Sequence, residues 1–291
     1  MTNNPKILTF DIESNLLHFK AFNTGEQYLN HTQLIPGKSR YSIICIAYRW
    51  LDGSGGIIKW GSKTGQKGII ERFDKIAEQA DIIIGKNSDR FDIKMINGIR
   101  ALNGIKGNPT WALCSDDIEK QMRKYFKLPS QSLDYISYQL GLGGKIKMEF
   151  KHWNQVDNYI TLLDLKERGM SKESLEIYSS YMFERSFSTV LKEGKKAFEE
   201  MCIYCEKDTE DTRSLWLKLS EHFDSKFNNA KFQGVPLACK HADCGSLALF
   251  KDGKKKLVNG SLYQKYSCVE CRRYAGKTLI SQTTGKEGGI R

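Results

Sequence analysis

The chain has 291 residues, of which 40% are hydrophobic and 27% are charged, which is typical of one large globular domain with something smaller beside it. No apolar run approaches the roughly 20 residues that a membrane helix needs, and the start of the chain, MTNNPKILTF, lacks the blocks of a signal peptide. These features argue against a membrane protein and favour a soluble, intracellular (cytoplasmic) one. In that compartment the eight cysteines are not expected to form a disulfide framework.

The net charge of +11 is unevenly distributed. Residues 231–291 carry 12 Lys and Arg against 4 Asp and Glu, whereas residues 1–230 carry 33 against 30. The positive excess therefore belongs to the C-terminal tail. Such a tail is either a solvated basic surface or a module that binds a polyanion such as nucleic acid.

The first 126 residues predict alternating strands and helices. β-Branched and aromatic runs predict strands at 6–13, 41–50, 56–60, 81–85 and 110–115, and the turn LDGSG joins the second and third strands into a hairpin. Apolar residues at helical spacing predict helices over 68–80 and 90–102, and Ser115 is expected to cap a third helix over 116–126. This order predicts an α/β fold.

The second half of the chain changes character twice. Residues 155–222 are predicted to be mainly helical, and after residue 236 the dipeptides Asp252-Gly253 and Asn259-Gly260 separate short strand-like runs. We expect a boundary near residues 226–236. The predicted domains are therefore 1–228 and a small β domain over 229–291.

Two carboxylates, Asp11 and Glu13, end the first predicted strand. They are two residues apart, so both side chains point to the same face and can approach one cation. A strand end exposed to water is the alternative explanation. A third carboxylate, Asp92, starts the helix after the buried strand 81–85, with Asn87 and Phe91 just before it. Asp92 is alternatively a helix cap.

A third acidic motif lies in the sequence YCEKDTEDT, at 204–212. Tyr204 and Asp208 are four residues apart and share one helix face. A solvated acidic face containing a core tyrosine is the alternative.

Together the three motifs resemble those of the DEDD superfamily of 3′–5′ exonucleases. The matching segments are FDIE at 10–13, the run from Asn87 to Asp92, and Tyr204-x3-Asp208. The histidine-containing branch has a His five positions before the last Asp, where this chain has Ile203, so the resemblance is to the tyrosine-containing branch. The segment 126–145 also resembles a connector of polymerase-associated members, and the resemblance covers roughly residues 6–216.

The resemblance implies a ribonuclease H-like fold and two Mg²⁺ or Mn²⁺ ions, which suit hard oxygen ligands. By resemblance, Asp11, Glu13 and Asp208 hold one ion and Asp92 supports the other. Tyr204 orients the attacking water, and Asn87 and Phe91 position the terminal nucleotide. The implied substrate is the 3′ end of single-stranded DNA. Trimming of RNA 3′ ends is the first alternative, and a non-catalytic nucleic-acid-binding module is the second.

The tail contains two close pairs of cysteines. Cys239-x4-Cys244 precedes Cys268-x2-Cys271 by a hairpin-sized segment, a spacing that fits a tetrahedral zinc site with four cysteine ligands and resembles a zinc ribbon. His241 is an alternative ligand. The helical pair Cys202-x2-Cys205 has no second pair near it and is not expected to bind zinc.

Basic residues surround the predicted zinc site, with three tyrosines interleaved. Lysines and arginines neutralise phosphates and aromatic rings stack on bases, so we expect the module to bind nucleic acid, although zinc ribbons also bind proteins. The candidate contacts are Lys254, Lys255, Lys256, Arg272 and Arg273.

Overall fold

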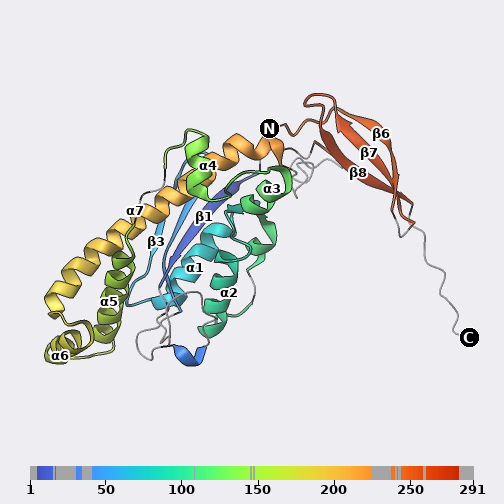
Figure 1. Cartoon of the computed structure of the whole chain (residues 1–291). Helices are drawn as coiled ribbons and strands as arrows, with labels where there is room; N and C mark the ends of the chain where they lie inside the picture. The colour runs from blue at the N-terminus through green and yellow to red at the C-terminus, as the bar shows by residue number, and fades with distance from the viewer. Residues whose placement is uncertain are drawn as a thin grey trace, which may run out of the picture. The chain divides into compact units, whose positions relative to one another are not determined.

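The computed structural model describes residues 5–15, 17, 31–34, 41–107, 109–144, 146, 148–223, 237–239, 241, 244–257 and 260–281 (Figure 1). The chain divides into two compact units. The larger unit contains residues 6–120 and 127–215, and the smaller contains 1–5, 121–126 and 216–291. The predicted boundary between residues 228 and 229 lies outside the described residues.

The larger unit is built on a mixed five-stranded sheet. Its strands are β1 (Ile7–Ser14), β2 (Ile43–Trp50), β3 (Gly55–Lys59), β4 (Ile82–Gly85) and β5 (Ser115–Asp117), in the order β3-β2-β1-β4-β5. The β1-β2 and β2-β3 pairs are antiparallel, whereas the β1-β4 and β4-β5 pairs are parallel. This confirms the predicted α/β class, and the mixed sheet fits a ribonuclease H-like fold.

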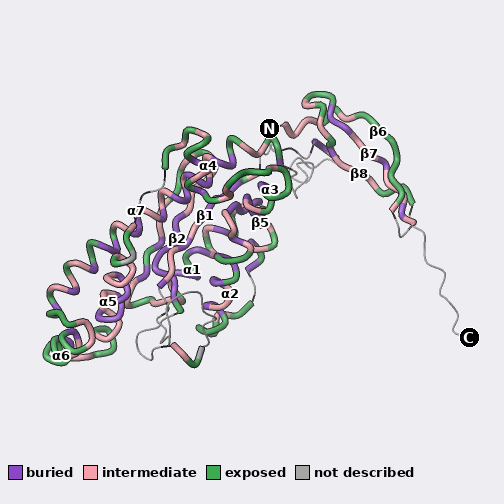
Figure 2. The backbone as a smooth tube through the Cα atoms, in the orientation of Figure 1, coloured by how far each residue is buried: buried purple, intermediate pink, exposed green. Residues whose placement is uncertain are grey.

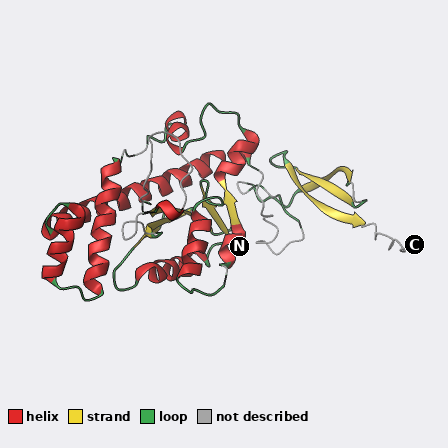
Figure 3. Ribbon diagram, turned by 60° about the horizontal axis from the view of Figure 1, so that its bottom comes forward, coloured by secondary structure: helices red, strands yellow, loops and turns green. Residues whose placement is uncertain are grey.

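Helices flank the sheet (Figure 3). They are α1 (Gly65–Ala77), α2 (Asp92–Leu102), α3 (Ile118–Tyr125), α4 (Leu133–Gln139), α5 (Phe150–Glu167), α6 (Lys172–Phe183) and α7 (Phe187–Leu219). The predicted helical region from 155 to 222 is thus confirmed. In the part of the chain that the structure describes, no helix is both long and apolar enough to cross a membrane.

Successive side chains of β1 point alternately to the two faces of the sheet. Leu8, Phe10 and Ile12 are buried in a core with residues of α1 and α2. Figure 2 colours the backbone by burial. On the opposite face of the sheet, α5 and α7 form a second core with β2. Because successive strand residues point to opposite faces, Asp11 and Glu13 face α7 rather than the α1–α2 core.

The smaller unit contains a three-stranded antiparallel sheet. Its strands are β6 (Leu249–Lys256), β7 (Leu262–Cys268) and β8 (Tyr274–Ser281), in that order. A buried cluster at this sheet consists mainly of cysteines, together with Ala275, Leu249 and Tyr266. This confirms the predicted small β domain, and the cysteine cluster fits a zinc ribbon.

Two local predictions are wrong. Residues Thr110–Cys114 form a 3-10 helix and not a strand, because the buried Trp111 ring packs against two other rings. Its centroid lies 5.2 Å from that of Phe73 and 6.0 Å from that of Phe10. Ser115 does not cap α3. It pairs with Ile83 as the first residue of β5.

One predicted turn is also different in the structure. Asp252-Gly253 lies inside β6, where the pairing with β7 shifts between Lys251 and Lys254, so it forms an irregularity of the strand. Asn259 lies outside the described residues, and Gly260 lies in the turn between β6 and β7.

Candidate functional site

Three of the predicted metal ligands lie together. A carboxylate oxygen from each of Asp11, Glu13 and Asp208 lies within 4.8 Å of the other two. The first two come from β1, and the third comes from α7, which covers the same face of the sheet. Carboxylates this close repel one another unless a cation lies between them, and oxygen donors of this kind suit Mg²⁺ or Mn²⁺. The donor set therefore fits a divalent ion.

Asp92 lies beside this cluster and is not part of it. It is the first residue of α2 and is buried, and its carboxylate accepts a hydrogen bond from the backbone N–H of Ile12, between Asp11 and Glu13. Burial raises the pKa of Asp92 to about 7, and the nearby charge of Asp117 acts in the same direction. A cation nearby would favour its ionised form.

Tyr204 lies one helical turn before Asp208, as the spacing predicted. Its half-buried ring contacts the ring of Trp153 in α5 edge-on, with centroids 6.2 Å apart and an interplanar angle of 75°. The catalytic tyrosine suggested by the sequence is therefore on the same helix as one carboxylate of the cluster.

The loop between β4 and α2 contains Asn87 and Phe91. Asn87 has a positive φ of 62°, and Phe91 is 50% exposed. The loop is held by Asp117 of β5, whose two carboxylate oxygens accept hydrogen bonds from the backbone N–H groups of Asn87 at 2.9 Å and Asp89 at 3.1 Å. Sequence reasoning missed Asp117, because it was assigned to the first turn of a helix.

A pocket of about 350 Å³ connects the motifs. Asp11, Asn87 and Asp208 line it, together with Lys86, Glu119, Ser132, Leu133 and Asp134. The Lys86 Nζ lies 2.9 Å from Glu119 Oε2, and both side chains are largely buried. Lys86 directly follows β4, and Glu119 comes two residues after β5. The carboxyl ends of parallel strands are a usual place for a ligand, and this signal could have identified both residues.

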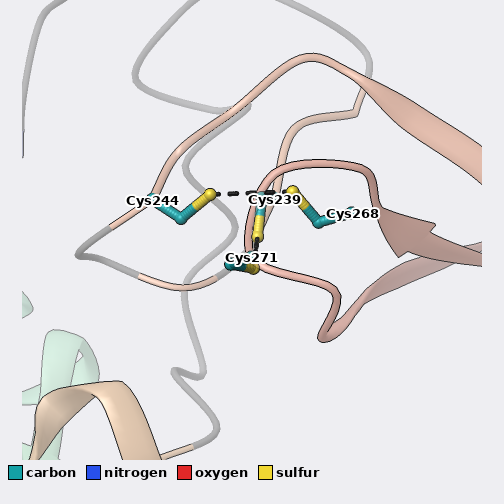
Figure 4. A group of neighbouring side chains, drawn as sticks. All are labelled: Cys239, Cys244, Cys268 and Cys271. Atoms are coloured by element: carbon teal, nitrogen blue, oxygen red, sulfur yellow. Dashed lines mark hydrogen bonds between the residues drawn. The ribbon is translucent and has the colours of Figure 1, made fainter.

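The four tail cysteines form a second cluster (Figure 4). Their sulfur atoms lie within 4.8 Å of one another, and the Cys239–Cys271 and Cys244–Cys268 sulfurs are 3.6 Å apart. A disulfide would need about 2.05 Å. Sulfurs around a tetrahedral zinc at about 2.3 Å lie about 3.8 Å apart, so the spacing fits zinc.

Local hydrogen bonds prepare one of these thiols to ionise. Burial acts to raise the pKa of Cys271, but hydrogen bonds from the backbone and side chain of Arg273 and from neighbouring sulfurs outweigh burial and lower that pKa to about 7. Burial raises the pKa of Cys239. His241 Nε2 lies 3.2 Å from the carbonyl oxygen of Tyr274, and the cluster comprises the four cysteines.

The other four cysteines lie in the larger unit. Cys45, Cys202 and Cys205 are buried in the core between the sheet and α7, and the Cys205 thiol lies 3.5 Å from the carbonyl oxygen of Asp11. That the Cys202-x2-Cys205 pair does not bind zinc stays a prediction. Cys114, which ends the 3-10 helix, is partly buried.

The predicted nucleic-acid contacts differ in their surroundings. Lys254, Lys255 and Lys256 are exposed along β6, and Arg272 is exposed beside the cysteines. Arg273 is less exposed, and its guanidinium donates a hydrogen bond to the backbone carbonyl of Glu221. Arg273 therefore has structural contacts within the smaller unit, whereas the three lysines lie on an open strand.

The similarity of this chain to known proteins lies among solved structures. No family model matches the chain. No curated protein matches it either. Among solved structures, the family B DNA polymerase from the hyperthermophilic archaeon Pyrobaculum calidifontis is similar, with a TM-score of 0.46 and 12% sequence identity. The match covers 88% of this chain and 32% of the polymerase, so the chain spans about a third of that protein.

Proposed function

We propose that the chain is a metal-dependent 3′–5′ exonuclease of the tyrosine-containing DEDD type, which hydrolyses phosphodiester bonds at the 3′ end of single-stranded DNA. The observation that supports this function best is the cluster of Asp11, Glu13 and Asp208, with Tyr204 one turn away on the same helix. The pocket beside the cluster has the size of a small-molecule site.

The proposed roles follow from the chemistry of the side chains. Asp11, Glu13 and Asp208 would hold the first divalent ion, and Asp92 would support a second. Two such ions, when bound, activate water and stabilise the leaving oxygen. Tyr204 would orient the attacking water by hydrogen bonding through its hydroxyl. Asn87 and Phe91 position the terminal nucleotide.

The smaller unit would assist nucleic-acid binding. Its four cysteines would hold structural zinc, and its basic residues would contact the phosphates of a nucleic-acid strand. The Lys277 Nζ lies 4.2 Å from the centre of the Tyr263 ring, so this ring contacts a cation of the same unit.

The direct test uses 5′-labelled single strands of DNA and RNA with matched sequences, incubated with Mg²⁺ or Mn²⁺. We expect a ladder that shortens from the 3′ end of DNA and is lost in EDTA. The variant Asp11→Ala/Glu13→Ala should lose about 1000-fold in rate, since metal ligation contributes several kcal/mol.

The matched control is Glu71→Ala/Glu78→Ala, which removes two exposed carboxylates, one in α1 and one at its C-terminal end. It should degrade DNA at the wild-type rate. Faster shortening of RNA would assign the activity to RNA 3′ ends. A lack of cleavage of either strand with either metal would overturn the exonuclease proposal and favour a nucleic-acid-binding module.

A further inference from the structure

Helix α5 places an aromatic ring against the proposed catalytic tyrosine. Trp153, in the first turn of α5, meets Tyr204 edge-on with ring centroids 6.2 Å apart. Edge-to-face pairs have a preferred geometry, so the contact restricts rotation of the Tyr204 side chain about its Cα–Cβ bond. That rotation sets the position of the hydroxyl oxygen.

The same face of α5 reaches the strand that carries two of the carboxylates. Asp157 lies four residues after Trp153, and its Oδ1 accepts a hydrogen bond of 2.6 Å from the side-chain amide of Asn15. Both partners are buried, and Asn15 follows the last residue of β1. One face of α5 thus contacts Tyr204 at one point and the end of β1 at another.

The packing of α5 on α7 has other contributors. Tyr159 and Phe198 pack with ring centroids 5.9 Å apart, and Val156 and Ile160 are buried against Ala197 and Met201. The two helices are therefore held together without the Trp153–Tyr204 contact. What that contact adds is control over one side chain.

We propose that Trp153 is a positioning residue for the hydrolytic reaction. It holds the Tyr204 ring so that the hydroxyl points at the attacking water, and it does not itself touch the substrate. The inference rests on the proposed exonuclease function, because it assigns a role to the surroundings of Tyr204.

A double-mutant cycle tests this role, with kcat and KM measured separately on the labelled DNA strand. Trp153→Leu should lower kcat about 10-fold and leave KM within about 2-fold, since misplacement of a reacting group acts on the chemical step. Tyr204→Phe removes the hydroxyl and should lower kcat at least as much. The double variant should equal Tyr204→Phe, because ring orientation matters only while the hydroxyl is present. Trp153→Phe, which keeps a ring, should restore kcat to within about 3-fold.

Tyr159→Leu is the matched control, because it removes the other α5 ring that packs on α7 and makes its ring contact with Phe198 instead of Tyr204. It should lower the melting temperature as Trp153→Leu does and leave kcat within about 2-fold of wild type. If Trp153→Leu does not fold, Trp153→Met takes its place with the same expectations.

Three outcomes overturn the proposal. In the first, the loss of kcat in the double variant equals the product of the two single losses. In the second, Tyr159→Leu loses as much kcat as Trp153→Leu. In the third, Trp153→Leu keeps the wild-type kcat. If the wild type is active and any of these outcomes is found, the positioning role of Trp153 is overturned and the exonuclease function is not. A wild type that degrades neither DNA nor RNA overturns the exonuclease function and the positioning role with it.

Discussion

At the scale of single residues, the buried pair of Asn15 and Asp157 fixes the end of the strand that carries Asp11 and Glu13. Asp157→Ala should lower the free energy of unfolding by about 1–3 kcal/mol, because it leaves the buried Asn15 amide without its acceptor. Urea denaturation would measure the loss.

Asp164→Ala is the control for this prediction. It lies on the same helix, and its carboxylate, which is 20% exposed, forms an ion pair with the exposed Arg168 at 2.9 Å. Solvent around the arginine screens this pair, so it should contribute at most about 1 kcal/mol. Equal losses of unfolding free energy in the two variants would mean that the Asn15–Asp157 hydrogen bond does not stabilise the protein more than the Asp164–Arg168 ion pair.

Periodicity explains which site residues the sequence could predict. The strand repeat placed Asp11 and Glu13 on one face, and the helical repeat placed Tyr204 beside Asp208. Asp117 was missed, because the sequence pattern assigned it to the first turn of a helix, whereas its hydrogen bonds to the loop at Asn87 depend on the pairing of β4 with β5.

At the scale of elements, helices α5 and α7 approach each other closely at Gly194. A Cβ there would lie 2.4 Å from the Tyr159 Cβ and 2.8 Å from the backbone oxygen of Gln155. Gly194→Ala should therefore destabilise the protein by about 1–3 kcal/mol, even though alanine favours a helix by about 1 kcal/mol. Thermal and urea unfolding would both detect this.

Gly98→Ala in α2 is the matched substitution. Its Cβ would meet only the half-exposed Tyr41 ring, at 3.3 Å, and that side chain can move. We expect Gly98→Ala to be neutral or stabilising. If Gly194→Ala is also stabilising, the close approach of α5 and α7 does not require a glycine at this position.

Secondary structure was predicted correctly where the pattern of apolar residues was long. The strands of the hairpin and helices α1 and α2 have many periodic positions, and their types were predicted correctly. The run at 110–115 is too short for its period to separate strand from helix, and the packing of Trp111 against Phe10 and Phe73 decided its conformation.

At the scale of the whole molecule, the two units depend differently on metal. The buried cluster at the β6-β7-β8 sheet of the smaller unit is mainly cysteine, whereas the larger unit has extensive apolar cores. Removal of zinc should unfold this sheet and leave the larger unit folded. In the zinc-loaded protein about one thiol, the partly buried Cys114, should react with a thiol reagent, and chelation should expose about four more.

The same thiol titration contains its own control. Cys45, Cys202 and Cys205 are buried in the larger unit, and they should stay unreactive until a denaturant is added. If they become reactive together with the four tail cysteines, the two units do not unfold separately.

Binding of a strand to the smaller unit should depend on salt. Replacing Lys254, Lys255 and Lys256 by Gln should weaken affinity for single-stranded DNA, and the slope of log affinity against log salt should fall by up to about 2, because each phosphate contact in a single strand contributes about 0.7. Filter binding at several salt concentrations would measure both, with Lys172, Lys192 and Lys195→Gln on α6 and α7 as the control. An unchanged slope would remove β6 from the proposed binding surface.

The carboxylates of the cluster come from opposite ends of the larger unit's sequence, Asp11 and Glu13 from β1 and Asp208 from α7. A ribosome must therefore synthesise most of the chain before a hydrolytic centre can assemble. A nascent or proteolysed fragment that stops before α7 has two of the three clustered carboxylates and lacks Tyr204. Under the proposed function, copies of this protein that stop before α7 cannot hydrolyse the nucleic acids around them.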